Sequence, residues 1–362
     1  MMNFDLTETQ QDIARLTADV LATCQWHHRS APGVTMAPST RIHPAWKELA
    51  RAGLLSLAIP AGLGGDGLGV LDVAVLLTEV GRRAAYVPAL ATLMTGIIPV
   101  ARWGDEALQR ELLPAAGAGE LILTAAIREP GDPFPARPAT RVAGGRVTGT
   151  KTGVPYAAQA GQILVAVSKA DAAASGEAAG ASTTTVVVVD PRADGVTLTR
   201  THTVTGEPEY SVTMHETPVT ATLGPATAPD LYRLAIAGAC AQADGALAGA
   251  LTLTRDHVAT RQQFGKKLAE FQAVAQQIAD IYITARIVHL TTLAAIWKLD
   301  TGKDADDDLS TATWWITEEE GIAVMSCHHL HGGIGVDDSY PLPRYSALIT
   351  DLQRFLGGGC VH

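Results

Sequence analysis

Cysteine is scarce in this sequence, and its four cysteines lie far apart. They form neither a Cys-x-x-Cys pair nor a spacing typical of a zinc site, so we expect no metal centre. Scattered thiols fit a reducing compartment, and we expect a cytoplasmic protein. Cys240 and Cys327 lie within apolar helical segments and are expected to be buried structural residues. The other two are Cys24 and Cys360.

Positive charge is also scarce. The 27 lysines and arginines are outnumbered by 37 aspartates and glutamates, which gives a net charge of -10, and no basic cluster is present. Nucleic-acid binding neutralises several phosphates with clustered basic side chains, so this class of partner is excluded. An acidic ligand would need a local group of cations.

Long uninterrupted apolar runs are missing. No stretch approaches the ~20 apolar residues that cross a bilayer. The first ten residues have neither the basic start nor the apolar run of a secretory signal. We therefore expect a protein that is neither exported nor inserted into a membrane.

The sequence does contain enough apolar residues for two or three compact units, with 47% apolar and 18% charged residues in 362. Helical spacing dominates the first part, and a capping box formed by Thr7 and Gln10 marks its first helix. The expected helices are residues 7–24, 44–53, 70–84, 88–102 and 105–113, with a loop at 31–44. Residues 1–120 are predicted to form an N-terminal helical domain.

The sequence texture changes at residue 121, where short runs rich in Val and Thr predict strands. These runs are residues 121–127, 146–152, 163–168, 183–190, 196–203 and 210–214, with a surface loop rich in Ala, Gly and Ser at 170–182. Long helical patterns return at 230–260, 268–299, 306–330 and 340–355. We therefore expect a middle β domain over 121–226 and a C-terminal helical bundle over 227–362.

Strands that are grouped, rather than alternating with helices, favour a mainly α protein with an inserted antiparallel β domain over a doubly wound sheet. This bears on the segment Gly62–Gly67, which fits the dinucleotide pattern G-x-G-x-x-G and follows the apolar run Leu54–Ile59. No βαβ repeat surrounds it, and no acidic residue follows ~20 positions later at the end of a second strand. We interpret it as a turn between helices.

The most informative segment is Arg261-Gln-Gln-Phe-Gly-Lys-Lys-Leu-Ala-Glu-Phe-Gln272. Arg261 ends a predicted helix, Gly265 gives the backbone freedom for a turn, and helical spacing resumes from Phe271. Gln272 and Gln276 then share one face. The segment is compatible with an ordinary corner between two helices, and also with half of a cofactor site in which the guanidinium binds phosphate.

A second segment, His328-His-Leu-His-Gly-Gly-Ile-Gly335, lies at the end of a predicted helix. His328 and His329 are adjacent and point apart on a helix, and no carboxylate stands at i+4, so we expect no metal here. Gly332 and Gly333 allow a close approach between the backbone and a bulky ligand. A plain helix C-terminus also explains them.

The order of helices, strands and helices, together with these two segments, resembles the acyl-CoA dehydrogenase family, flavoenzymes that introduce a double bond α,β to a thioester. Pro60–Gly69, Glu129-Pro-Gly131 and Gly149-x-Lys151 are similar to further family motifs, so the resemblance covers essentially the whole chain. It implies an N-terminal helical domain, a middle antiparallel β domain and a C-terminal four-helix bundle.

The resemblance also implies an FAD site shared across a subunit interface, because both C-terminal motifs of the family reach the FAD of a neighbouring subunit. The implied contacts are Arg261 with the pyrophosphate, Phe264 near the adenosine, Gln272 with the dinucleotide, Gly332 and Gly333 against the phosphates or adenine, and His329 where the family usually has Gln.

The catalytic carboxylate of the family has no counterpart here. That base removes the α proton while the flavin takes the β hydrogen as hydride. Its usual position is occupied by Leu356-Gly-Gly-Gly359, and the position used by a minority of members is occupied by Tyr232. A phenol with a pKa near ~10 is a poor base at neutral pH. We expect no catalytic residue at Tyr232 or Gly357–Gly359.

The flavin-facing segments Ile127–Phe134 and Lys151–Pro155 also depart from the family pattern. The chain thus resembles the base-less subunit of actinobacterial heteromeric (α2β2) acyl-CoA dehydrogenases, which mostly act on CoA thioesters of sterol and bile-acid side chains. This implies a homologous partner that carries the catalytic Glu and most of the acyl-CoA site. It also implies an electron-transfer flavoprotein or an equivalent acceptor.

Two alternatives stay open. One is a self-sufficient homo-oligomer with a relocated base such as Asp351 or Glu129, although Asp351 precedes the expected position by about two helical turns, or ~9 Å. The other is a flavin-free scaffold subunit.

Overall fold

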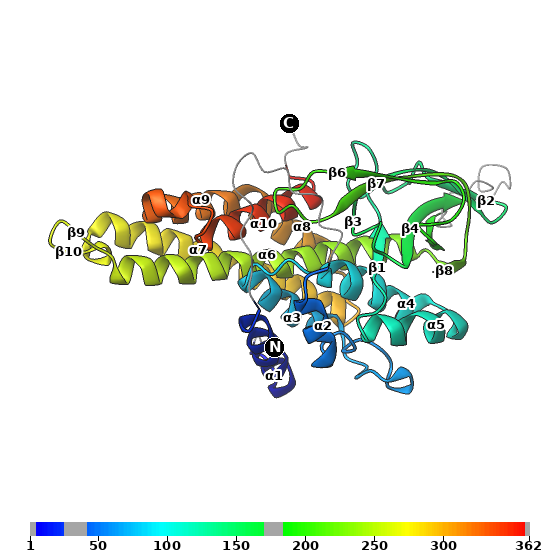
Figure 1. Cartoon of the computed structure of the whole chain (residues 1–362), viewed down its shortest axis with the longest axis horizontal. Helices are drawn as coiled ribbons and strands as arrows, with labels where there is room; N and C mark the ends of the chain where they lie inside the picture. Colours follow the sequence, from blue (N-terminus) through cyan, green and yellow to red (C-terminus); the bar gives the residue numbers. More distant parts are fainter. Residues whose placement is uncertain (1–4, 25–41, 170–183, 359–362) are drawn as a thin grey trace.

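The computed structural model describes residues 5–24, 42–169 and 184–358. The predicted loop at 170–182, most of the loop at 31–44, Gly359 and Cys360 lie outside these ranges. Within them, helices, strands and long helices follow one another in the predicted order (Figure 1).

The N-terminal part contains the predicted helices. The backbone N–H of Gln10 donates to Thr7 Oγ1 at 3.3 Å, and the N–H of Thr7 donates to Gln10 Oε1 at 3.0 Å, which confirms the capping box. The elements are α1 (Glu8–Ala22), α2 (Ala45–Arg51), η1 (Ala61–Leu63), α3 (Val70–Arg82), the π-helix η2 (Leu90–Ile97), α4 (Ile98–Trp103) and α5 (Glu106–Gly117).

The glycine-rich segment forms η1 and a turn between α2 and α3. Leu54–Ile59, which precedes it, consists of turns rather than a strand, so no strand leads into this segment. Gly64 and Gly67 have φ of 85° and 65°, a conformation that favours glycine. The interpretation as a turn between helices is confirmed.

The middle part is one twisted sheet with the order β6-β7-β3-β2-β4-β5-β8, and β1 pairs with β4. Its strands are β1 (Leu123–Ala126), β2 (Arg141–Ala143), β3 (Arg146–Pro155), β4 (Gln162–Lys169), β5 (Thr184–Val189), β6 (Val196–Thr201), β7 (Glu209–Pro218) and β8 (Ala221–Pro225). Every residue of β5 is buried, because Val186 and Val188 face the helical core and Val187 and Val189 face a second core within the β unit.

The expectation of an antiparallel sheet is wrong in one respect, because the sheet is mixed. β1 and β2 both run parallel to β4, along the same edge of that strand. Leu123 is in register with Gln162, and Arg141 is in register with Ser168, so the two short strands follow one another along β4. The chain between them, residues 127–140, forms no named strand and carries the isolated bridges Arg128–Thr152 and Glu129–Asp132.

The C-terminal part is a bundle of long helices that runs along the molecule (Figure 1). The segment predicted as a single helix over 306–330 contains a π-helical turn. The elements are α6 (Thr227–Thr260), the hairpin β9 (Gln262–Gln263) and β10 (Lys266–Lys267), η4 (Leu268–Glu270), α7 (Gln272–Asp300), α8 (Asp306–Trp314), the π-helix η5 (Trp315–Glu320), α9 (Gly321–His331), η6 (Gly332–Val336) and α10 (Leu342–Phe355).

Two glycines allow α3 to lie directly against α6. A Cβ added at Gly245 would lie 1.8 Å from the carbonyl oxygen of Thr78, and one added at Gly81 would lie 1.9 Å from that of Gln242. Any side chain at either position would push the helices apart. This contact holds the N-terminal helices against the bundle.

In the part of the chain that the structure describes, two helices are long and apolar enough to cross a membrane by length and composition. The apolar window of α6 is 83% buried inside the protein, which identifies α6 as a core helix, whereas that of α7 is only 22% buried. Cys240 and Cys327 are buried free thiols, as predicted.

Candidate functional site

The Arg261–Gln272 segment forms a projecting tip at the end of α6, opposite the sheet (Figure 1). Phe264 and Gly265 make the hairpin turn with φ of 54° and 81°, so the predicted role of Gly265 is confirmed. The Phe264 side chain is 91% exposed. Lys266 places its Nζ 4.2 Å from the centre of the Phe271 ring.

Arg261 is exposed, and in the described part of the chain no hydrogen bond or ion pair holds its guanidinium. Lys266 and Lys267 are exposed on the same hairpin. Gln272, the first residue of α7, is also exposed. The tip thus offers three cations and an amide, the donor set that a pyrophosphate needs, so these residues fit the phosphate part of a dinucleotide.

The second predicted segment lies beside the first. The imidazole of His331 stacks on that of His257, which stands four residues before Arg261, with ring centres 4.4 Å apart. Gly332 ends α9 with φ of 64°, and a Cβ added at Gly332 or Gly333 would meet no atom within 4 Å. His329 is exposed on the last turn of α9. The structure therefore brings the two motifs together and leaves their backbone open to a ligand.

The positions where the family carries its base contain no carboxylate among the described residues. Tyr232 is 8% exposed, and burial raises the pKa of its phenol further above the ordinary value. Gly357 has φ of 94°, and a Cβ there would approach Pro133 to 3.0 Å. Longer side chains at 357 would require this loop to move.

Aromatic side chains fill the space between these two positions. Phe134 packs against Tyr232 and Phe355, with ring centres 5.9 Å and 6.2 Å apart. The Arg128 guanidinium lies 5.9 Å from the centre of the Phe355 ring. Arg128 and Phe134, within the segment that departs from the family pattern, thus contact the end of α10.

Glu129 is held in a buried ion pair. Its Oε1 lies 2.9 Å from Lys151 Nζ, and its carboxylate accepts the backbone N–H groups of Ala139 and Thr140 at 2.7 and 2.9 Å. Burial raises the pKa of Glu129, but the Lys151 ammonium and these donors outweigh that effect and hold the pKa below its usual value. A carboxylate so well satisfied is a structural anion rather than a base.

The carboxylate of Asp351 is also held by hydrogen bonds. Its carboxylate accepts the N–H groups of Val204 and Thr205 at 3.0 and 2.9 Å and the hydroxyl of Thr205 at 2.8 Å. Arg354, one turn later on α10, makes two hydrogen bonds of 3.0 and 2.7 Å with Glu209. These contacts fasten α10 to the start of β7 and the loop before it. Because Glu129 and Asp351 are both held by hydrogen bonds, neither is well suited to be the relocated base.

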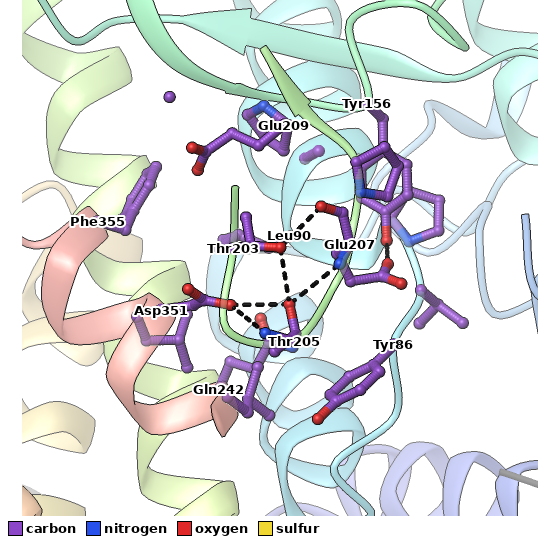
Figure 2. A pocket seen from close by; sticks show the side chains of 18 of the residues that line it. Tyr86, Leu90, Tyr156, Thr203, Thr205, Glu207, Glu209, Gln242, Asp351 and Phe355 are labelled. Atoms are coloured by element: carbon purple, nitrogen blue, oxygen red, sulfur yellow. Dashed lines mark hydrogen bonds between the residues drawn. The ribbon is translucent and has the colours of Figure 1, made fainter. Parts of the chain in front are cut away.

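A cavity of about 130 Å³ lies between the start of η2, the loop before β7 and α10 (Figure 2). The sequence did not point to its Glu207, whose Oε2 accepts a hydrogen bond from the Tyr156 hydroxyl. Glu207 is half-buried at the edge of the cavity, and desolvation, together with nearby Asp351, raises its pKa to about 7. The signal in the sequence was Glu207-Pro-Glu209, two acids where β7 begins. Gln242 from α6 also faces the cavity.

Within the described ranges, no group of three or more His, Cys, Asp or Glu side chains is placed to hold a metal ion. His328 Nε2 lies 3.0 Å from Ser346 Oγ, and His331 Nδ1 lies 2.8 Å from the carbonyl oxygen of Cys327. His328 and His331 thus have packing and hydrogen-bonding roles.

The fold and both motifs define a class of protein, and comparison with known proteins gives the same class. The acyl-CoA dehydrogenase N-terminal domain matches residues 7–120, and the acyl-CoA dehydrogenase C-terminal domain matches residues 231–358. The chain therefore belongs to the acyl-CoA dehydrogenase family, oxidoreductases that act on CH–CH bonds and that typically bind FAD.

Particular relatives cover nearly the whole chain. It is 42% identical over 359 residues to acyl-CoA dehydrogenase FadE28 of Mycobacterium tuberculosis, covering 99% of this chain and 96% of that protein. It is 31% identical to FadE27 of the same organism, covering 99% and 95%.

Two solved structures share the fold, each with a TM-score of 0.84. One is a variant of the Tcur3481–Tcur3483 steroid ACAD, with 32% identity and coverage of 97% of this chain and 94% of that chain. The other is the ChsE4–ChsE5 complex from Mycobacterium tuberculosis, with 29% identity and coverage of 99% and 95%. The predicted fold class is confirmed.

Proposed function

We propose that this chain is the base-less subunit of a heteromeric acyl-CoA dehydrogenase and completes the FAD site of a homologous partner. The observation that carries the proposal is that Arg261, at the tip, and the Gly332–Gly333 backbone beside it form one surface. Within the described residues it offers an unpaired guanidinium and bare backbone on the outside of the molecule. A site that faces outward is suited to a cofactor held mainly by another subunit.

The proposal is supported by the state of the chain's own flavin-facing region. Phe134, Tyr232 and Phe355 pack together at the positions where the family carries its base, and Glu129 and Asp351 are held by other groups. A base needs a carboxylate within hydrogen-bond reach of the proton that it removes. In this proposal that carboxylate belongs to the partner.

The roles of this chain are binding and orientation. Bound FAD would take the β hydrogen of the acyl group as hydride. Arg261 would neutralise pyrophosphate charge, Gln272 would hydrogen-bond the dinucleotide, and Phe264 would cover its adenosine side. The backbone of Gly332 and Gly333 and the side chain of His329 would complete this half of the site.

The surface of the bundle supports a subunit partner. Apolar side chains stand outward on α7, α8 and α9 although most of the other large apolar residues are buried. Such a face favours burial against another acyl-CoA dehydrogenase bundle. The exposed residues are Tyr282 (58%), Ile283 (53%), Trp314 (51%), Ile322 (62%) and Met325 (64%).

The substrate class follows from the relatives. Because one solved neighbour is described as a steroid ACAD, we infer a CoA thioester of a steroid side chain, bound mainly by the partner, and a role in lipid and steroid catabolism. An electron-transfer flavoprotein or an equivalent acceptor would reoxidise the flavin. Buried free Cys240 and Cys327 support a cytoplasmic location.

The first test is the ratio of FAD to protein for the chain purified alone and after co-expression with homologous acyl-CoA dehydrogenase subunits of its organism. We expect almost no FAD on the isolated chain, and about one FAD for each pair of subunits in the complex. One FAD on each isolated chain would refute the half-site proposal.

A second candidate is a self-sufficient dehydrogenase that uses Glu207 as its base. The observation in its favour is the cavity of Figure 2, where Glu207 has a pKa of about 7, a value suited to proton abstraction at neutral pH. Turnover by the chain alone that disappears in Glu207→Gln would support this candidate. Absence of turnover in FAD-saturated wild type would eliminate it.

A further inference from the structure

Two imidazoles form a stack that joins the two motifs of the tip. His257 and His331 lie 4.4 Å apart at an interplanar angle of 23°, and the Tyr340 ring packs on His331 at 5.2 Å. His331 Nδ1 donates to the Cys327 carbonyl, which fixes the tautomer and leaves Nε2 unprotonated in the neutral ring. That Nε2 is buried without a hydrogen-bond partner among the described residues.

The stack stands next to both halves of the site. Arg261 donates its backbone N–H to the carbonyl of His257 at 2.8 Å, so the two residues are one helical turn apart. His331 directly precedes Gly332, whose N–H closes the last turn of α9. Any shift between the rings would therefore move Arg261 relative to the Gly332–Gly333 backbone.

We propose that His257 and His331 are positioning residues that hold Arg261 and the Gly332–Gly333 backbone in register for FAD, and that protonation of this stack separates them. The proposal rests on the proposed function as an FAD half-site. Neither ring would touch the chemistry, and each acts through the group beside it.

The surroundings of the stack favour neutral rings. His257, on α6, lies near Arg261, which follows the end of that helix. His331 lies near His257 and His328, and the ring of Tyr340, which precedes α10, packs on His331. Burial lowers the pKa of both histidines, and for His257 the Arg261 cation adds to this effect. No carboxylate is among the groups that shift either pKa. Two cations this close, beside Arg261, would repel each other, which would weaken FAD binding by about fivefold or more.

The experiment measures the FAD dissociation constant of the co-expressed complex by flavin fluorescence between about pH 8 and about pH 5.5, a window that spans histidine titration. We expect wild type to lose at least about fivefold in affinity across this range. His331→Phe keeps an aromatic ring but cannot be protonated, so it should restore a flat profile. His331→Ala should weaken FAD binding at every pH.

Two controls separate the possible failures. His202→Phe removes an exposed imidazole from the β domain and should retain the wild-type profile. If Arg261→Ala does not change FAD affinity, the half-site function itself fails. If Arg261→Ala weakens binding but His331→Phe titrates like wild type, or His331→Ala binds like wild type at about pH 8, the positioning role is wrong. Circular dichroism of each complex identifies a variant that has simply unfolded.

Discussion

Replacing Arg261 by Ala removes the group on which the half-site depends most. The guanidinium has no hydrogen-bond or ion-pair partner among the described residues, so its loss should change the free energy of unfolding by less than about 0.5 kcal/mol. Its proposed partner is a pyrophosphate, and hydrogen bonds to charged groups contribute about 1.5–3 kcal/mol when desolvated. The variant should therefore fold normally and fail to retain cofactor.

The expected magnitude follows from these values. A loss of about 2 kcal/mol corresponds to roughly thirtyfold weaker FAD binding by the complex. Arg261→Lys keeps the charge but loses the planar fork of donors, so it should fall between Ala and wild type. Because the pair is electrostatic, the difference between wild type and Ala should shrink as salt is added.

The assay is equilibrium dialysis of FAD against the purified complex, with flavin absorbance as the readout. Arg255→Ala is the matched control, because Arg255 is exposed on the same helix and pairs with Asp256. The complex that carries Arg255→Ala should lose little affinity for FAD. FAD binding within twofold of wild type in Arg261→Ala would refute the assigned role and favour the flavin-free scaffold.

Three further predictions concern the body of the protein. Glu129→Gln leaves Lys151 buried without its anion and should lower the free energy of unfolding by about 3–5 kcal/mol in urea titrations; Glu129→Gln with Lys151→Met should regain most of it. Since the folded pKa of Glu129 is depressed, this stability is present above its ordinary pKa and is lost as the pH falls through the folded value. The pKa of Glu207 is shifted in the opposite direction. Its folded pKa of about 7 lies above the ordinary value, so stability is lost as the pH rises from the ordinary pKa to the folded pKa. Glu207→Gln should then stabilise the chain on the order of 2 kcal/mol at about pH 8 and have little effect near pH 4, and equal effects at both would contradict the assignment. Gly245→Ala should lower the melting temperature strongly because its Cβ would overlap Thr78, whereas Gly62→Ala, with no neighbour within 4 Å, should not.

Much of the fold could be predicted from local patterns. The capping box of Thr7 and Gln10, the apolar spacing of the long helices and the Val- and Thr-rich strands each express a preference of a few adjacent residues. The turn at Phe264 and Gly265 was similarly accessible, because glycine tolerates the positive φ that the turn requires.

The pairing of strands could not be predicted in this way. Whether β1 and β2 share one edge of β4 depends on the path of the segment at 127–140, and nothing in the composition of strands of four and three residues encodes that choice. The environment of Glu207 could not be predicted either, because it also depends on contacts between segments that are distant in sequence. That environment depends on Tyr156 and Asp351, which are distant in sequence and meet only after the sheet and α10 have docked.

The candidate site also has features that local motifs predict and features that only the structure shows, and this difference bears on function. Motifs predict that Arg261 and Gly332 bind one cofactor, but only the structure shows that these residues, 71 positions apart, adjoin the stacked rings of His257 and His331. The proposed flavin-facing region of this chain has the opposite character, because Phe134 packs against Phe355 rather than facing outward. In the proposed function, a subunit that keeps its outward-facing binding groups but lacks a base contributes to catalysis only at an interface. The FAD content of the isolated chain and of the complex should therefore differ far more than their stabilities do.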